Sequence, residues 1–382
     1  MIYDVLDFKD LNTKVSYNLF NTKGGVAEFH AILELTNDHS KFSAAEQFDK
    51  VNQSIVHLFL QPFLQNVSPA LLRWFVSDVV NQAELIQLSD NVAVSIVQQS
   101  PLNGSKVALW IYGIENIQSI RTPDNAISIK RPGYTHHYHT QLFTTEGNAF
   151  QQTTSIFNNY IKSLSQMQCS LDVNCMRTWL FVHNIDSQYN DIVVARRNIF
   201  ELENLIPQTH FISSTGIEGK YKYPEVITLM DAYAISGIMQ EQIVYLKGSS
   251  HLNPTHEYGV TFERGTSVQF GDRRHVYISG TASINNKGEI VHPFDIELQT
   301  IRVLENINVL LVEAECNMED IAQLIIYIRD ISDYSSVNKY MRNQYPSIPM
   351  IIVLAPVCRP GWLIEMECVA IKGIEDSRFK KF

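Results

Sequence analysis

The pattern of apolar and polar positions is clearest in the last third of the chain. Apolar residues at helical spacing predict one helix over 293–315 and a second over 335–344, which ends before Pro346. A second strand or loop follows the strand at 275–280 and extends to Ile290. Short runs rich in β-branched and aliphatic residues predict strands at 275–280, 323–329, 350–354 and 362–371. The predicted order is therefore β-β-α-β-α-β-β.

The same order of elements recurs twice upstream, which indicates an internal repeat. The middle copy has predicted helices at 150–168 and 192–205 and strands at 176–182, 210–214 and 226–235. The N-terminal copy has a predicted helix at 48–60 and strands at 29–35, 71–78, 92–100 and 106–114. The middle and last copies match best, because residues 227–235 align with residues 363–371 without a gap.

We therefore expect an α+β fold of three divergent units, 1–125, 126–236 and 263–382, with 237–262 as a connecting segment. A mixed sheet with helices on one face must bury its other face. Three such sheets can bury these faces against one another, which predicts a pseudo-threefold body with the helices on the outer face. The alternative is an α+β protein in which similar runs recur by chance.

Composition narrows the classes of function and partner. The chain is 45% hydrophobic and 18% charged, which is typical of a globular protein. Its net charge of −10 argues against a nucleic-acid partner, since phosphate binding needs clustered Lys and Arg. The longest apolar runs are strand-sized, so we expect no membrane partner. The N-terminus lacks a signal-peptide pattern, and five cysteines at irregular spacing suit reduced thiols, so we expect a cytoplasmic protein.

The common cofactor motifs do not occur in the sequence. There is no dinucleotide fingerprint, P-loop, GxSxG or HExxH. The histidines at 136, 137 and 139 have no carboxylate or thiol at ligand spacing, which favours an exposed strand or loop over a metal site. We therefore expect no metal and no cofactor.

The C-terminal unit contains a set of diagnostic segments: 276–280 (VYISG), 299–300, 304–307, Tyr327 with 329–330, 337–338, and 357–370. Through these residues the unit resembles the Rid/YjgF family. Rid proteins are homotrimers with a site in each cleft between subunits, which implies a cleft site between units here. Rid imine deaminases carry an arginine at the position of Met350, fifteen residues before Glu365, and this departure argues against simple imine deamination.

A second set of segments extends over residues 130–372: 177–179, 183–185, 195–197 with Phe200, 214–217 (STGI), 258–259, 278–284 (ISGTASI), and 358–359 before 364–365. Through these segments the chain resembles the chorismatase family, whose C-terminal half is Rid-like. Residues 285–292 (NNKGEIVH) differ from the usual Gly-His-Glu type turn. The resemblance implies a cofactor-free lyase or hydrolase that cleaves the enol ether of chorismate, a small cyclic dianion. The products would be pyruvate and a hydroxybenzoate or a dihydroxy-diene acid.

Enol ether cleavage needs a proton delivered to the methylene carbon. A glutamate buried on a strand can stay protonated near neutral pH, and the family position implies that Glu365 is this general acid. Glu367 shares its face of the strand, and the alternative is that both are solvated. In the repeat alignment Leu229 stands opposite Glu365 in the middle unit, and Ala108 or Leu109 in the first. Only one of three clefts would then be acidic.

Two substrate carboxylates call for arginine, which pairs with them bidentately. Arg329 at a strand end is the first candidate, and its alternative is a surface ion pair with an adjacent aspartate. Arg177 on the matching strand and Arg359 in a turn are further candidates. Residues that would offer hydroxyl or backbone N–H donors, or only form tight turns, are Thr215, Gly216, Gly280 and Thr281. The chorismatase resemblance adds Tyr258.

The chorismatase resemblance also points to Cys358, seven residues before Glu365. Chorismatases that form 3-hydroxybenzoate carry a cysteine at about this position, which implies a second catalytic residue and favours that product. The alternative is a buried structural thiol. Two other functions stay open, a Rid-like enamine or imine deaminase and a non-catalytic protein that binds small carboxylates. We expect a monomer with a pseudo-trimeric core, or a weak homo-oligomer.

Overall fold

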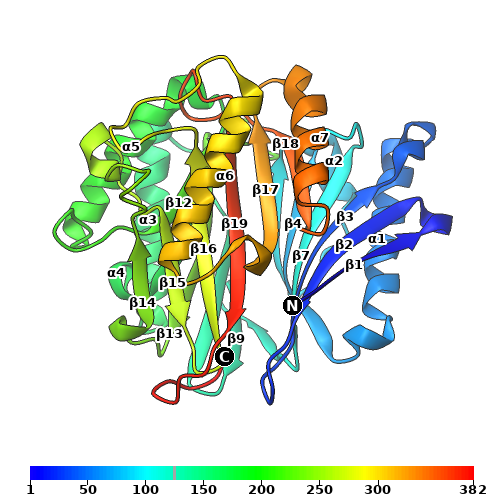
Figure 1. Ribbon diagram of the computed structural model, residues 1–382, viewed down its shortest axis with the longest axis horizontal. Coiled ribbons are helices and arrows are strands. Elements are labelled where there is room, and N and C mark those ends of the chain that lie inside the picture. The colour runs from blue at the N-terminus through cyan, green and yellow to red at the C-terminus, as the bar shows by residue number, and fades with distance from the viewer. Residues whose placement is uncertain (124–125) are drawn as a thin grey trace.

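Three mixed β-sheets form the centre of the protein, and helices lie on the outside (Figure 1). The structure, a computed structural model, describes residues 1–123 and 126–382. The first sheet has the order β1-β2-β3-β7-β4-β5. Its strands are β1 (Ile2–Phe8), β2 (Thr13–Phe20), β3 (Glu28–Leu35), β4 (Val67–Val76), β5 (Ala93–Gln98) and β7 (Val107–Glu115). Its helices are α1 (Ala44–Phe59) and the short α2 (Val79–Gln82).

The second sheet has the order β12-β11-β13-β10-β9-β8. Its strands are β8 (Ser119–Arg121), β9 (Ile127–Arg131), β10 (Tyr134–Leu142), β11 (Cys175–Val182), β12 (Ser213–Glu218) and β13 (Thr228–Ser236). Its helices are α3 (Ala149–Gln166), α4 (Leu171–Asn174) and α5 (Ile185–Leu202). Asn148 caps α3 by accepting a hydrogen bond from the backbone N–H of Gln151, whose side chain binds back to the Asn148 N–H.

The third sheet has the order β14-β15-β16-β19-β17-β18-β6. Its strands are β14 (Ile243–Leu246), β15 (Gly265–Gln269), β16 (Arg273–Ala282), β17 (Ile321–Ile328), β18 (Met350–Leu354) and β19 (Ile364–Gly373), with β6 (Ser100–Pro101) added from the first unit. Its helices are α6 (Ile296–Glu313) and α7 (Tyr334–Gln344). No helix in the described ranges is long and apolar enough to cross a membrane.

The three sheets share one topology. Each contains a single parallel pair, β4 with β5, β11 with β12, and β17 with β18, next to antiparallel neighbours. The predicted order β-β-α-β-α-β-β is present in every unit. An α+β fold with three mixed sheets and helices is therefore confirmed, and the shared strand order is consistent with three Rid-like units.

The inner faces of the sheets share one hydrophobic core. A single buried cluster contains Trp110 of the first sheet, Trp179 of the second and Ile278 of the third. Each sheet also bridges the next one, through Gln98 to Lys220, Ser213 to Glu263, and Val353 to Pro101. The first two sheets form separate outer clusters with their helices. Burial of the inner faces against one another thus follows the packing expected from the sequence.

Several element boundaries differ from the sequence prediction. Helix α1 begins at Ala44 and not at 48, and β12 covers Ser213–Glu218 and not 210–214. Helix α5 begins at Ile185, before the predicted start at 192, because the Glu218 carboxylate accepts the backbone N–H groups of Asn184 and Ile185 at 3.1 and 2.7 Å. This cap comes from a distant strand, so no local signal announces it. The connecting segment contains β14, which pairs with β15. The predicted boundary at residue 125 lies outside the described residues, although β8 before it already pairs with β9.

The histidines of β10 lie in a strand, but they are not exposed. His136, His137 and His139 are each at most 5% exposed. Each ring pairs with hydroxyl groups, such as His136 with Tyr233 at 2.7 Å, and these bonds allow polar rings to be buried. The expectation of an exposed segment was wrong because hydroxyl groups from other parts of the sequence each pair with a ring nitrogen of these histidines.

Candidate active site

A cavity lies in the cleft between the second and third units. Its walls come from α5 and β12 on one side and from β16, β19 and the loops before β15 and β19 on the other. Six of the residues predicted as functional line it: Gly216, Tyr258, Gly280, Cys358, Arg359 and Glu365. The expected position between two units is therefore where these residues meet.

Glu365 forms part of the cavity wall from β19. Its side chain is 4% exposed, and no described residue donates a hydrogen bond to its carboxyl group. Burial first, and the neighbouring charge of Glu367 second, raise the pKa of Glu365 to about 8, while Arg177 and Arg264 lower it. The carboxyl group is therefore protonated at neutral pH and can donate a proton.

Each sheet has a strand position equivalent to that of Glu365. Among the described residues only the third sheet carries an acid there. In the third sheet Glu365 pairs in register with Tyr327. The same register position holds Leu229 opposite Phe181 in the second sheet and Ala108 opposite Phe75 in the first. The other two clefts thus have apolar groups where the acid would stand, as the repeat alignment predicted.

Two predicted substrate ligands lie behind the cavity wall instead of in it. Arg177 is 2% exposed and forms an ion pair with Glu367 at 2.7 Å. Thr215 is 1% exposed and also hydrogen-bonds to Glu367. Neither residue lines the cavity. Both instead bind Glu367, the carboxylate that follows the candidate acid by two residues.

The two glycines of the cavity lie where a side chain would meet neighbouring atoms. The Gly280 N–H already donates to Thr215 Oγ1 at 2.9 Å. A Cβ at Gly216 would lie 3.1 Å from the Tyr189 ring, so this glycine accommodates Tyr189. Thr281 is fully buried, and its hydroxyl donates to the Ser279 carbonyl at 2.9 Å. Thr281 therefore lies outside the lining.

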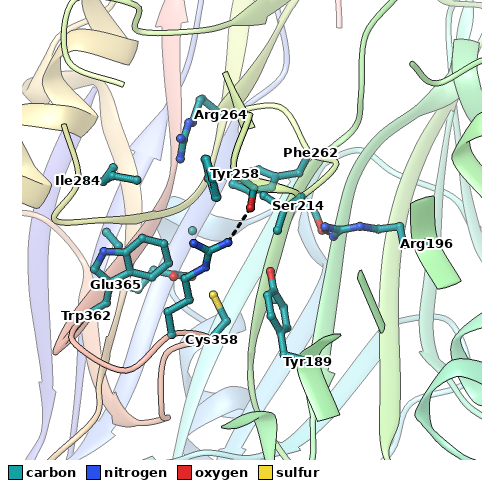
Figure 2. Close-up of a pocket in the computed structure, with 15 residues that line it drawn as sticks. Tyr189, Arg196, Ser214, Tyr258, Phe262, Arg264, Ile284, Cys358, Trp362 and Glu365 are labelled. Carbon is teal, nitrogen blue, oxygen red and sulfur yellow. Dashed lines mark hydrogen bonds between the residues drawn. The ribbon is translucent and has the colours of Figure 1, made fainter. Parts of the chain in front are cut away.

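Three arginines surround the cavity without a carboxylate partner. Arg196 comes from α5, Arg264 directly precedes β15, and Arg359 lies in the loop before β19. None of them forms an ion pair in the part of the chain that the structure describes. Figure 2 shows Arg264 and Arg196 approaching from different sides. Positive charge beside a neutral acid makes the cavity suited to an anion.

The lining also carries buried donors without a partner among the described residues. They are Arg196 Nη2, Arg264 Nε and Trp362 Nε1. The three side chains are at most 5% exposed. Because buried donors are normally paired, these groups suit a ligand that is rich in acceptor oxygens.

Cys358 and Tyr189 lie next to each other at the edge of the cavity (Figure 2). The phenol hydroxyl and the thiol are close enough to affect each other's proton affinity. Burial first, and then the charge of Glu365, raise the pKa of the Cys358 thiol to about 12. Cys358 is therefore a neutral thiol at physiological pH and not a thiolate nucleophile.

Arg329, the first candidate for a substrate ligand, lies outside the cavity. Its guanidinium pairs with Asp186 at the start of α5 and donates to the Val357 carbonyl at 3.1 Å. The position of Arg329 at the end of a strand was predicted. Its partner is not an adjacent aspartate but Asp186 of the second unit. This contact joins the two units beside the cleft.

Nine lining residues were not singled out from the sequence, among them Tyr189, Arg196, Arg264 and Trp362. Arg196 lies in one of the segments that resemble chorismatases and Trp362 in one that resembles Rid proteins, and these resemblances were the available signals. Arg264 lies between the predicted elements, and its orientation depends on Asn253, which accepts two hydrogen bonds from it at 3.0 and 3.2 Å. Such a loop contact has no periodic pattern in the sequence.

Comparisons with known proteins identify relatives of the C-terminal unit. Residues 266–372 match the family model described as endoribonuclease L-PSP. A RutC family protein of Pyrococcus abyssi is 33% identical over 100 residues, which make up 25% of this chain and 78% of that protein. The chain belongs to the RutC (Rid/YjgF) family. A 3-aminoacrylate deaminase RutC of Acinetobacter baylyi is 31% identical over 97 residues, 25% of this chain and 77% of that enzyme.

The remaining part of this RutC family member also has a structural counterpart. A crystal structure of a chorismatase superposes with a TM-score of 0.64 at 17% identity, covering 81% of this chain and 96% of that one. The chain therefore has the chorismatase fold over most of its length. The predicted combination of that fold with a Rid-like C-terminal unit is confirmed.

Proposed function

We propose that the protein is a chorismatase-like enzyme that releases pyruvate from chorismate. The observation that carries this proposal is a buried neutral acid, Glu365, in a cavity with three arginines that have no carboxylate partner. A neutral acid can protonate a carbon atom, and unpaired guanidinium groups can hold a dianion. The fold similarity to a chorismatase supports the same reaction.

In the proposed reaction Glu365 transfers its proton to the methylene carbon of the enol ether. The resulting cation is stabilised by the ether oxygen. Water adds to it to form a hemiketal, and the proton that the water releases returns to the Glu365 carboxylate. The hemiketal then breaks its bond to the ring oxygen, and its hydroxyl proton passes to that oxygen, which gives pyruvate and the ring diol. Loss of the ring hydroxyl as water would return the consumed water and give 3-hydroxybenzoate.

The substrate carboxylates would bind to Arg196, Arg264 and Arg359. The Arg359 guanidinium lies over the Tyr258 ring at 4.8 Å and donates to the Tyr258 carbonyl at 2.8 Å, which fixes its position. Buried charge-assisted bonds of this kind each contribute about 1.5–3 kcal/mol. Arg177 and Thr215 would act on the acid indirectly, and Arg329 would have no contact with substrate.

The decisive experiment is incubation of the purified protein with chorismate, with pyruvate measured by a coupled assay. We expect pyruvate release, and the loss of about 10²–10⁴-fold in rate for Glu365→Gln, because the amide keeps the shape of the side chain but cannot donate the proton. Wild-type protein that releases no pyruvate, or a Glu365→Gln variant with full activity, would contradict the proposal.

The family resemblance favours 3-hydroxybenzoate as the second product, with Cys358 controlling the outcome. The thiol lies next to the acid and is neutral, so it would shape the site around the ring and not attack it. We expect Cys358→Ala to change the ratio of aromatic product to diene-diol, as measured by chromatography. An unchanged ratio would mean that Cys358 is a structural residue.

A RutC-like deaminase is the second candidate, supported by the family membership and by the relative that is a 3-aminoacrylate deaminase. Met350, where Rid deaminases carry arginine, is fully buried at the start of β18. Ammonia release from an imine substrate, without pyruvate release from chorismate, would favour this candidate. Binding of chorismate without either product would indicate the non-catalytic alternative.

We also propose that the three units are arranged about a pseudo-threefold axis. The shared strand order and the bridges from each sheet to the next support this arrangement. One chain would then supply both sides of each cleft, which Rid proteins obtain from separate subunits.

A further inference from the structure

Glu367, two residues after Glu365 on the same face of β19, has no part in the proton transfer described above. We propose that Glu367 is a positioning residue that keeps Glu365 in its acid form, as a fixed negative charge anchored by the second unit. This inference rests on the proposed function, because it concerns the acid of that reaction.

The hydrogen bonds of Glu367 identify it as an ionised carboxylate. The Trp179 indole N–H donates to Oε1 at 2.8 Å, and Arg177 donates to Oε2 at 2.7 Å. The Thr215 oxygen accepts from Arg177 and from the Gly280 N–H, so its own proton is left for Glu367. Every partner of Glu367 is thus a donor, and a carboxylate that only accepts hydrogen bonds carries a charge.

Glu365 has the opposite surroundings, with no hydrogen-bond donor among the described residues. Its buried carboxyl group lies on the same strand face as the Glu367 charge, and two such carboxyl groups cannot both ionise easily. The charged or titratable groups around it come from β11, β17, α5 and the segments before β15 and β19, as well as from β19. They are Arg177, Tyr189, Arg264, Tyr327, Cys358 and Glu367, together with Arg196, Tyr258 and Arg359, which line the same cavity.

The anchor of Glu367 extends through all three units. Arg73 of β4 lies between aromatic rings, with its guanidinium 4.4 Å from the Trp179 ring centre. It pairs with Asp231 at 3.0 Å and approaches Glu367 at 3.7 Å. The first unit, whose own cleft lacks an acid, thereby contributes a cation to the network behind Glu365.

Asp231 provides a matched control for Glu367. In register, Asp231 pairs with Trp179 in the second sheet as Glu367 pairs with Ile325 in the third. Both are buried carboxylates paired with a buried arginine. The difference is the neighbour two residues earlier, which is Leu229 beside Asp231 and Glu365 beside Glu367. Asp231→Asn should therefore disturb the network without changing the proton affinity of the acid as strongly.

The test measures the protonation of Glu365 in the variant Glu367→Gln. One readout is the infrared C=O band of the carboxylic acid, which is assigned to Glu365 because Glu365→Gln lacks it. The other readout is the pH dependence of pyruvate release. Without the fixed negative charge, the positive charge of Arg177 has no counter-charge. The pH at which Glu365 loses its proton should therefore fall by at least about one unit. The rate at pH 8 should fall about fivefold or more, while KM changes little because Glu367 does not line the cavity.

Two further variants separate this role from a merely structural one. Glu367→Asp keeps the charge and should restore most of the wild-type pH profile, whereas Asp231→Asn should leave the infrared titration nearly unchanged. Equal shifts in Asp231→Asn and Glu367→Gln, or no shift in a folded Glu367→Gln, would overturn the proposal. If the band shifts as expected in a protein that releases no pyruvate, the electrostatic link holds and the proposed function fails.

Discussion

Gly280 leaves the space that the Glu365 carboxyl group occupies. A Cβ at residue 280 would lie 2.0 Å from Glu365 Oε1, which is less than any normal contact. The register between β16 and β19 shifts between Ile278 and Thr281, so Gly280 sits in an irregular part of the strand. Glycine at such a position lets the backbone approach a neighbouring side chain closely.

We therefore expect Gly280→Ala to displace Glu365 and to lower the rate of pyruvate release at least about tenfold, since small displacements of a proton donor are costly. The variant should still fold, because the carboxyl group can rotate away. Gly373→Ala is the control, as its Cβ would meet Thr22 at an ordinary 3.7 Å. Equal rates for Gly280→Ala and wild type would show that this close approach does not matter.

The proton affinity of Glu365 predicts the pH dependence of the reaction. An acid whose pKa is raised to about 8 is protonated below that pH and loses its proton above it. We expect kcat/KM for chorismate to be level between about pH 6 and pH 7 and to fall about tenfold per unit well above pH 8. Activity that rises with pH over this range would instead indicate a general base.

The same group predicts how stability changes with pH. Between the ordinary pKa of 4.5 and about 8, folded Glu365 retains a proton that the unfolded chain has released. Stability from this group is therefore lost as the pH rises, by at most about 1.4 kcal/mol per unit. Glu365→Gln cannot release a proton. The urea midpoint of the variant minus that of wild type should therefore increase from pH 5 to pH 8. A constant difference between the two midpoints would contradict the raised pKa.

The arginines of the cavity and of its surroundings are expected to behave differently. Arg196 is 2% exposed and has no carboxylate partner in the described part of the chain. Arg196→Met should raise KM at least about tenfold without loss of stability, because the change removes an unpaired buried charge.

Arg329→Met is the control for this prediction, since Arg329 pairs with Asp186 at the protein surface. Its KM should remain within about twofold of wild type, as exposed pairs contribute little. Steady-state kinetics and thermal unfolding of both variants decide the assignment. A large rise in KM for Arg329→Met alone would restore the interpretation that the sequence favoured.

Strand and helix order, and with them the register of the acid, were predictable because they depend on local periodicity. Glu365, Leu229 and Ala108 share one register position, which a gap-free strand alignment transfers directly. The arginines were harder to assign, because a long side chain can reach several partners. Arg196 lines the cavity, whereas the adjacent Arg197 donates to the Gly259 carbonyl, and helix phase alone separates them.

Arg177 shows why burial of charge is invisible to sequence patterns. It lies in a strand whose residues are all buried, and its partner Glu367 belongs to another unit. A strand arginine in a sequence normally indicates an exposed edge. Here the pairing of two units supplies the counter-charge, so the position became clear only with the tertiary structure.

The single-chain origin of the cleft predicts how the protein behaves in solution. The walls of the cavity come from α5 and β12 on one side and β19 on the other, all within one chain. The inner sheet faces are covered within the same chain, so no second copy is needed to bury them. We expect light scattering to give a mass near 43.7 kDa, and specific activity to stay constant on dilution. A trimer that loses activity on dilution would mean that a second chain completes the site.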